Sequence, residues 1–272
     1  EFTLKMRRAE SRNFVYLRRR AKPSEADAIL SLGLPGVYGE KEYHRFYPGG
    51  EIAAHVVGFT NIDDVGQEGI ELSFDDWLSG KPGKKKVLKN LYGEIVRDIM
   101  PVAEAVPGRN LRLSIDQRLQ FLAYRELKSA IAQYEALSGS FVLLDVQTGE
   151  VLAMANQPSY NPNNRIQLDL SSVRNRAVTD VFEPGSTVKP FTVAVALESG
   201  LDMGYTIDTS PGFLKVDDAV IKDPRNRGTL DLGGILAYSS QVGISRLALS
   251  LNEYAIWKQF QTLGFGEVTG VG

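Results

Sequence analysis

A serine and a lysine three positions apart, Ser186 and Lys189, begin a segment with strong helix signals. Pro184 and Gly185 stop whatever precedes them, as proline and glycine do at segment boundaries. Gly200 follows the last apolar residues, where a helix commonly ends. The sequence therefore predicts a helix from Ser186 to Gly200. Its apolar face would be formed by Val188, Phe191, Val195 and Ala196.

On a helix, side chains three residues apart lie side by side. A serine hydroxyl is a weak nucleophile unless a neighbour takes its proton, and a lysine can do so when its amine is neutral. Burial and the positive end of the helix dipole both disfavour the charged form of Lys189. Free N–H groups at the helix start are suited to stabilise an oxyanion. The pair predicts acyl transfer with Ser186 as nucleophile and Lys189 as base, although the tetrapeptide alone is a common chance match.

The composition excludes several other kinds of site. The chain has 31 basic and 33 acidic residues, a net charge of −2, which argues against a protein that neutralises nucleic-acid phosphates. It has no cysteine, and its two histidines, His44 and His55, fit no common ligand spacing. We therefore expect no metal site and no nucleic-acid partner. With 43% hydrophobic residues the chain can still form a core.

No apolar run approaches the roughly 18 residues of a membrane span, and no signal peptide opens the chain. The sequence starts at Glu1 without a methionine, so we expect a piece of a longer protein whose anchor lies elsewhere. The basic residues 6–20 are interpreted as a solvated helix or strand, with a nucleic-acid or anionic-lipid patch as the alternative.

Local patterns predict the elements along the chain. Residues 23–32 favour a short helix capped by Ser24 with Ile29 and Leu30 inward, and residues 37–108 favour small strands with a charged hairpin turn at 81–86. Three further elements are expected: a strand with Leu111, Leu113 and Ile115, a helix at 116–134 capped by Asp116, and a hairpin of residues 140–146 and 150–155. The predicted apolar helix face is Leu119, Leu122, Ala123, Leu127, Ala130 and Ile131. Helix, hairpin and further helices indicate an α+β fold with an antiparallel sheet.

The phrase DVFEPGSTVKPF, residues 180–191, resembles the active-site segment of class B penicillin-binding proteins, those of the cell-division type in particular. Other long phrases continue the resemblance in the family's order. They are residues 45–72 (RFYPGGEIAAHVVGFTNIDDVGQEGIEL), 111–120 (LRLSIDQRLQ), 143–163 (LLDVQTGEVLAMANQPSYNPN), 174–186 (RNRAVTDVFEPGS) and 263–272 (LGFGEVTGVG). The resemblance covers most of the chain from Phe14 onward.

This resemblance implies two domains. Residues 1–110 would form an elongated, mainly β, non-catalytic module of the pedestal or dimerisation type. Residues 111–272 would form the α+β transpeptidase domain, similar to the β-lactamase fold with an antiparallel sheet and helices. No K-[ST]-G motif follows Ser239. We therefore expect the domain to be incomplete at Gly272, and the chain alone to lack half of its substrate clamp.

The implied activity is peptidoglycan D,D-transpeptidation in septal wall synthesis. Ser186 would be acylated by the penultimate D-Ala of a stem peptide, with Lys189 as base and Ser239 as proton relay. The family's S-x-N motif falls at residues 239–241, which implies that Ser240 and Gln241 bind substrate. Gln241 departs from the usual asparagine: it offers the same amide groups on a longer stem. β-Lactams would acylate Ser186, and no metal or organic cofactor is needed.

Family analogy adds a location and partners. The chain would be the periplasmic part of an inner-membrane protein with a single N-terminal anchor, and its partners would include a membrane glycosyltransferase and division proteins. Three alternatives remain open. They are a D,D-carboxypeptidase or β-lactamase using Ser186 and Lys189 with water as acceptor, a non-catalytic β-lactam sensor or division scaffold, and an unrelated domain with a chance motif.

Overall fold

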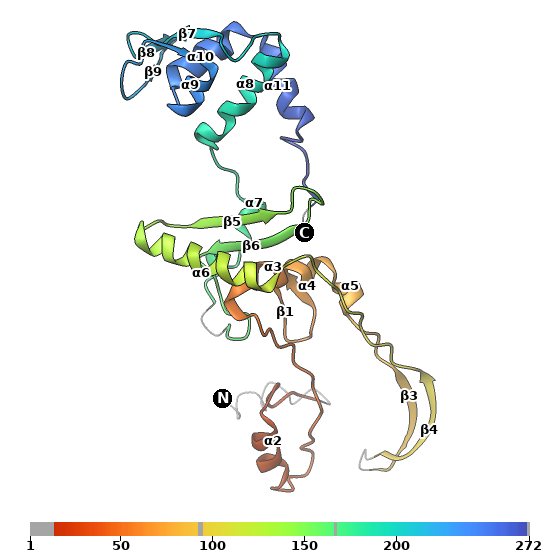
Figure 1. The fold of residues 1–272 in the computed structure, drawn as a ribbon. Helices are drawn as coiled ribbons and strands as arrows, with labels where there is room; N and C mark the ends of the chain where they lie inside the picture. Colours follow the sequence, from red (N-terminus) through yellow and green to blue (C-terminus); the bar gives the residue numbers. More distant parts are fainter. Residues whose placement is uncertain (1–13, 92–94, 166–167, 271–272) are drawn as a thin grey trace. The chain divides into compact units, whose positions relative to one another are not determined.

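The computed structural model describes residues 14–91, 95–165 and 168–270 of the chain (Figure 1). Contacts between residues divide it into two units, of which the first ends at Asp180 and the second begins at Val181. Within the described residues both units contain helices and strands, and every strand pair is antiparallel. The α+β prediction is confirmed. The boundary predicted between residues 110 and 111 stays a prediction.

Short helices and strands follow one another at the start of the first unit. They are α2 (Pro23–Leu30), η1 (Gly50–Ile52), α3 (Ala54–Val57), β1 (Phe59–Thr60), β2 (Gly66–Glu68), α4 (Gly69–Ser73) and α5 (Asp75–Leu78). The helix predicted at residues 23–32 is present, but Lys22 is its N-cap, so the prediction for Ser24 is wrong. Pro23 occupies the first helical position, which proline favours. Ile29 and Leu30, predicted to face inward, are 41% and 40% exposed.

The basic segment at residues 6–20 is described only from residue 14, and residues 6–13 lie outside the described residues. Arg19 Nε donates to Glu42 at 2.7 Å, and an Arg20 guanidinium N–H donates to Asp64 at 3.1 Å. The Arg19 guanidinium also lies 4.8 Å from the centre of the Tyr16 ring. These two arginines therefore stabilise neighbouring loops of the same unit.

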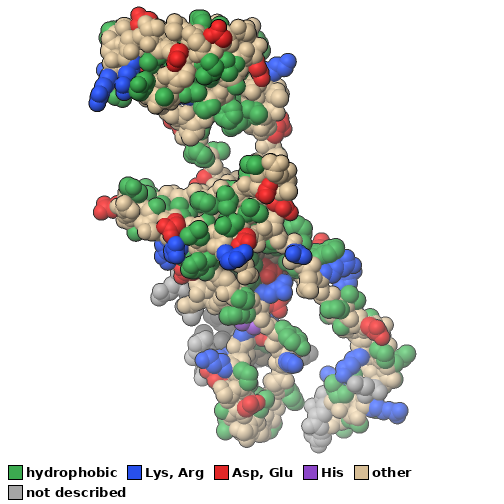
Figure 2. Space-filling view, in the orientation of Figure 1, with side chains coloured by type: hydrophobic (Ala, Val, Ile, Leu, Met, Phe, Trp, Pro, Cys, Tyr) green, Lys and Arg blue, Asp and Glu red, His purple; other side chains and the backbone are tan. Residues whose placement is uncertain are grey.

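A long two-stranded ribbon, β3 (Lys84–Lys89) and β4 (Ile95–Ala103), follows α5. The turn predicted at residues 81–86 is wrong, because Lys84, Lys85 and Lys86 lie on strand β3 with exposed side chains. Figure 2 shows basic and hydrophobic side chains along this ribbon. Leu88 of β3 and Met100 of β4 are 52% and 56% exposed.

The centre of the first unit is a helix packed on a hairpin. Its elements are α6 (Gln117–Gln133), β5 (Gly139–Leu144), β6 (Val151–Gln157), η2 (Leu170–Ser172) and α7 (Arg176–Thr179). The Asp116 carboxylate accepts the N–H groups of Arg118 and Leu119 at 2.8 and 3.1 Å, so the predicted cap is confirmed. The predicted hairpin is also confirmed, with Val142 opposite Met154.

Two details of this region differ from the sequence-based expectations. The predicted strand at residues 111–115 is wrong, since these residues pair with no other strand. The face of α6 is also rotated: Gln120, Ala123 and Tyr124 are buried, whereas Leu122 is 45% exposed. The pattern of apolar residues could not predict the burial of Gln120, because glutamine is polar.

The second unit holds the rest of the chain. Its elements are η3 (Gly185–Val188), α8 (Lys189–Glu198), β7 (Thr206–Asp208), β8 (Phe213–Val216), β9 (Ala219–Lys222), β10 (Thr229–Asp231), α9 (Leu232–Ala237), α10 (Gln241–Ser250) and α11 (Glu253–Thr262). Strand β7 pairs with β10, and β8 pairs with β9. The core between them contains fully buried apolar side chains of α8, α9 and α10. These include Ala196, Leu232, Ile235 and Leu247. Among the helices described, none combines the length and apolar character needed to cross a bilayer.

Candidate active site

The segment that carries Ser186 and Lys189 folds as predicted, with one difference in its first turn. Ser186 lies in the 3₁₀ turn η3, and Lys189 begins the α-helix α8. Gly185 has φ +60°, a conformation that costs little only for glycine. Gly200, at φ +94°, follows the helix end in the left-handed conformation typical of that position. The predicted helix from 186 to 200 is therefore confirmed.

Ser239 occupies the turn between α9 and α10 in an unusual conformation. Its φ is +50°, which non-glycine residues rarely adopt. The N–H groups of Ser239 and Ser240 donate to Leu236 O and Ile235 O at 3.1 and 2.9 Å. This pair of bonds is a Schellman motif, in which the residue after the helix is left-handed. The helix ending thus fixes the backbone that presents the Ser239 side chain.

A chain of hydrogen bonds joins the three predicted catalytic residues. Lys189 Nζ donates to Ser239 Oγ at 2.9 Å and to Ser239 O at 2.7 Å, and Ser239 Oγ donates to Ser186 Oγ at 2.8 Å. Ser239 Oγ therefore stands between the lysine amine and the Ser186 hydroxyl. The structure places these side chains within proton-transfer reach of one another, while their catalytic roles stay predictions.

Burial changes the pKa of the Lys189 amine. Lys189 is only 8% exposed, and its burial lowers the pKa of its amine below the ordinary value of 10.5. The negative charge of Asp223 opposes this change. Since desolvation is the larger effect, the neutral amine becomes accessible at lower pH than for a solvated lysine.

The other two predicted residues differ in exposure. Ser240 is 2% exposed, and its hydroxyl donates to Asp223 at 2.5 Å and accepts the N–H of Gly243 at 2.8 Å. Gln241, the first residue of α10, has an exposed side chain. Substrate contact by Ser240 and Gln241 stays a prediction; the Ser240 hydroxyl already has two internal partners.

Asp223 is a site neighbour that the sequence reasoning missed. It directly follows β9, and its carboxylate accepts the Gln241 and Val242 N–H groups at 2.6 and 3.2 Å. Nothing in the local sequence indicates this role, because its partners lie 17 to 19 residues further along the chain.

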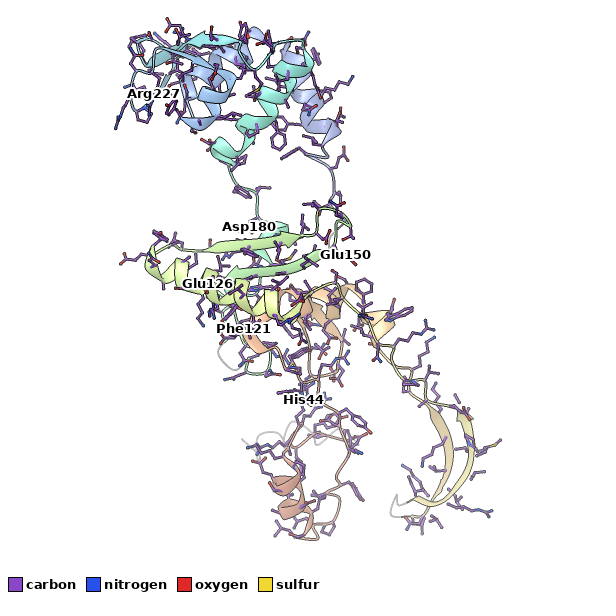
Figure 3. The ribbon with its side chains drawn as sticks, in the orientation of Figure 1. His44, Phe121, Glu126, Glu150, Asp180 and Arg227 are labelled. Carbon is purple, nitrogen blue, oxygen red and sulfur yellow. The ribbon has the colours of Figure 1, made fainter. Side chains whose placement is uncertain are left out.

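A cation lies next to the Ser239 turn. The Arg227 guanidinium carbon is 4.1 Å from the centre of the Tyr238 ring, and Tyr238 directly precedes Ser239. Figure 3 labels Arg227 on the loop that leads from β9 to β10. A stacked guanidinium adds a positive charge to this side of the turn.

Two family models match the chain in succession. The penicillin-binding protein dimerisation domain matches residues 2–113, and the penicillin-binding protein transpeptidase domain matches residues 139–272. The chain belongs to the penicillin-binding proteins that join a dimerisation domain to a transpeptidase domain.

Its named relatives are cell-wall transpeptidases. Peptidoglycan D,D-transpeptidase FtsI of Escherichia coli K12 is 48% identical over 260 residues, which are 95% of this chain and 44% of the relative. Probable peptidoglycan D,D-transpeptidase PbpC of Pseudomonas aeruginosa is 43% identical over 263 residues, 96% of this chain and 46% of the relative. The chain therefore spans less than half the length of these relatives.

Solved structures of penicillin-binding proteins are also similar to this chain. Penicillin-binding protein 3 of Mycobacterium tuberculosis, complexed with aztreonam, is 31% identical with a TM-score of 0.71. The match covers 84% of this chain and 48% of that one. A second structure of the same protein, complexed with ampicillin, gives the same values. These β-lactam complexes concern the relative; the shared fold places this chain in the same family.

Proposed function

We propose that the full-length protein is a peptidoglycan D,D-transpeptidase that cross-links stem peptides through an acyl-enzyme on Ser186. The observation that carries the proposal is the hydrogen-bonded chain from Lys189 through Ser239 to Ser186. A serine nucleophile needs a base within reach, and here a buried amine reaches it through one hydroxyl.

The acylation step follows from this geometry. Ser186 Oγ attacks the penultimate D-Ala carbonyl, and its proton passes through Ser239 Oγ to the neutral amine of Lys189. When the tetrahedral intermediate collapses, the C–N bond to the terminal D-Ala breaks. That amine leaves with a proton returned along the same path, and an ester to Ser186 remains. Attack by the amine of a second stem peptide reverses these transfers and forms the cross-link.

β-Lactams fit the same step. Attack of Ser186 on the lactam carbonyl opens the four-membered ring, but the leaving nitrogen stays tethered to the acyl group. The acyl-enzyme then persists, because the departing amine cannot diffuse away. The aztreonam and ampicillin complexes of the M. tuberculosis relative are consistent with this expectation. Ser240 and Gln241 are proposed to contribute to substrate binding next to Ser239.

The setting of the protein is also a proposal. Named relatives that act on peptidoglycan support a periplasmic location. We place the chain in the periplasmic part of an inner-membrane protein with a single anchor. A membrane glycosyltransferase and cell-division proteins are the proposed partners, contacted through residues 1–110.

Mass spectrometry of the full-length protein with benzylpenicillin tests the activity. One covalent adduct on Ser186 is expected, and Ser186→Ala abolishes it. Ser199→Ala is the matched control, because Ser199 Oγ bonds Val195 O at the far end of α8. The absence of an adduct on the wild-type protein would favour a non-catalytic scaffold. Gln241 supports that interpretation, because it departs from the asparagine usual in the family. Rapid turnover of a chromogenic β-lactam would instead favour a hydrolase.

A further inference from the structure

The carboxylate of Asp223 collects hydrogen bonds from three consecutive residues. Oδ2 accepts from the Ser240 hydroxyl at 2.5 Å, and Oδ1 accepts from the N–H groups of Gln241 and Val242 at 2.6 and 3.2 Å. These residues directly follow Ser239 in the chain. Asp223 thus accepts hydrogen bonds from the N-cap residue of α10 and from its first two helical residues.

The cap at this helix start is complete. The first N–H groups of a helix have no partners within the helix. Here Asp223 takes those of Gln241 and Val242, and Ser240 Oγ takes that of Gly243 at 2.8 Å. A negative charge is also favoured at this end of the helix dipole. The first residues of α10, directly after Ser239, are therefore held by the side chain of Asp223, which belongs to neither α9 nor α10.

The backbone of Asp223 is itself held. Its N–H donates to Gly212 O at 3.0 Å, next to the β8–β9 pair. Gly212 has φ +92°, and a Cβ there would lie 3.1 Å from Asn226. The β8–β9 hairpin thus provides the anchor for the carboxylate that grips α10.

This grip matters because the Ser239 conformation is strained. A serine at φ +50° is stable only if its surroundings hold it. On its N-terminal side the turn is held by the Schellman bonds of α9, and on its C-terminal side by Asp223. Proton transfer through Ser239 depends on distances of 2.8 and 2.9 Å to Ser186 and Lys189.

We propose that Asp223 is a positioning residue of the acylation reaction, which holds Ser239 between Lys189 and Ser186 through the start of α10. The proposal rests on the function proposed above. Asp223 itself contacts neither the Lys189 amine nor the Ser186 hydroxyl by a hydrogen bond in the described part of the chain. Its charge nevertheless acts on Lys189, which gives a readout that a purely structural cap would not move.

The test measures acylation of the full-length protein by a fluorescent penicillin across pH. Asp223→Ala is expected to lower the second-order rate constant by at least about tenfold, since displacements near 1 Å can cost about a hundredfold. Asp223→Asn keeps an acceptor for the two N–H groups but removes the charge. It is expected to lose less rate than alanine and to shift the rising limb of the pH profile to lower pH.

Asp116→Ala is the matched control, because Asp116 also accepts two backbone N–H groups at a helix start but belongs to α6. It is expected to leave acylation unchanged. A normal rate in Asp223→Ala, an equal loss in Asp116→Ala, or an unshifted limb in Asp223→Asn would each overturn the proposal. Ser186→Ala separates the two hypotheses: if it is labelled like the wild type, the proposed function fails and takes this inference with it. If Ser186→Ala is not labelled but Asp223→Ala is labelled at the wild-type rate, this inference fails while the proposed function stands.

Discussion

The hydroxyl of Ser239 donates a 2.8 Å hydrogen bond to the hydroxyl of Ser186. This direction suits a protonated Lys189, whose amine can only donate. When the amine loses a proton it gains a lone pair, and both hydroxyls can turn round without moving their oxygens. Ser186 then donates to Ser239, and Ser239 donates to Lys189. In the proposed mechanism, the same heavy-atom distances would therefore suit both a resting state and a state in which the Ser186 proton can be removed.

Replacing the bridging hydroxyl should therefore cut the path. Ser239→Ala is expected to lower the acylation rate constant of the full-length protein by about 10²-fold or more, the range of general acid–base contributions. Stopped-flow or gel labelling with a fluorescent penicillin measures it. Thermal unfolding should change little, and a rate near that of the wild type would show that Lys189 reaches Ser186 without Ser239.

Acylation should rise with pH through the ionisation of Lys189. Burial lowers the pKa of this amine below 10.5, so the neutral, proton-accepting form grows in as pH rises through that depressed value. A pH–rate profile should show a rising limb with its midpoint below 10.5. Lys189→Arg, which stays charged, should lose both the limb and most of the rate. A rate independent of pH in the wild type would contradict the assignment.

The same pKa has a consequence for stability. Between the depressed pKa of Lys189 and 10.5, the unfolded chain binds more protons at this residue than the folded chain. The contribution of this residue to the free energy of unfolding therefore rises with pH across that window. In Lys189→Met this contribution is absent, so the free energy of unfolding of the wild type minus that of the variant should increase as pH rises through this window. Urea unfolding at two pH values in that window measures the difference.

The strain at Ser239 predicts an unusual ranking of variants. Left-handed backbone costs an L-residue about 1–2 kcal/mol, and glycine avoids this cost but loses about 0.5–1 kcal/mol through its freedom in the unfolded chain. Ser239→Gly should accordingly be more stable than Ser239→Ala by up to about 1 kcal/mol. Both lack the hydroxyl and should be equally slow in acylation. Chemical unfolding of the two variants gives the comparison, and a more stable alanine variant would refute it.

The sequence could predict the parts of the site that are close in the chain. Ser186 and Lys189 are three residues apart, so helix geometry predicts neighbouring side chains. In the structure Ser239 Oγ forms a hydrogen bond with each of them. Ser239 is 50 residues from Lys189, and only the resemblance to a family pointed to it. Neither local spacing nor the family resemblance predicted the role of Asp223. A carboxylate that follows a strand does not indicate which distant helix it will cap.

Prediction of the fold from sequence was limited in a similar way at residues 111–115. Leu111, Leu113 and Ile115 alternate in the sequence, and in the structure they are partly buried and separated by exposed residues. This alternation did not predict the backbone, because a strand requires a partner that the sequence pattern does not supply. In the structure Leu111 and Leu113 line a cavity of about 620 Å³ instead of joining a sheet.

A buried glutamine provides the last test. Gln120 is 2% exposed; its Nε2 donates to Ile52 O and Met154 O, both at 2.7 Å, and its Oε1 accepts the Met154 N–H at 2.8 Å. It thereby satisfies the outer edge of β6, where Met154 turns both backbone groups away from β5. Gln120→Leu leaves these groups unpaired and should cost about 3 kcal/mol of unfolding free energy, even though leucine fits the apolar pattern of α6.

Gln133→Leu makes the same chemical change at the exposed end of α6 and should cost less than about 0.5 kcal/mol. Urea unfolding of both variants, followed by circular dichroism, measures the two free energies. Equal effects would mean that the backbone groups around Gln120 find other partners. A large difference would identify this amide as the contact that fixes the α6–β6 register, since leucine supplies volume there but no hydrogen bonds.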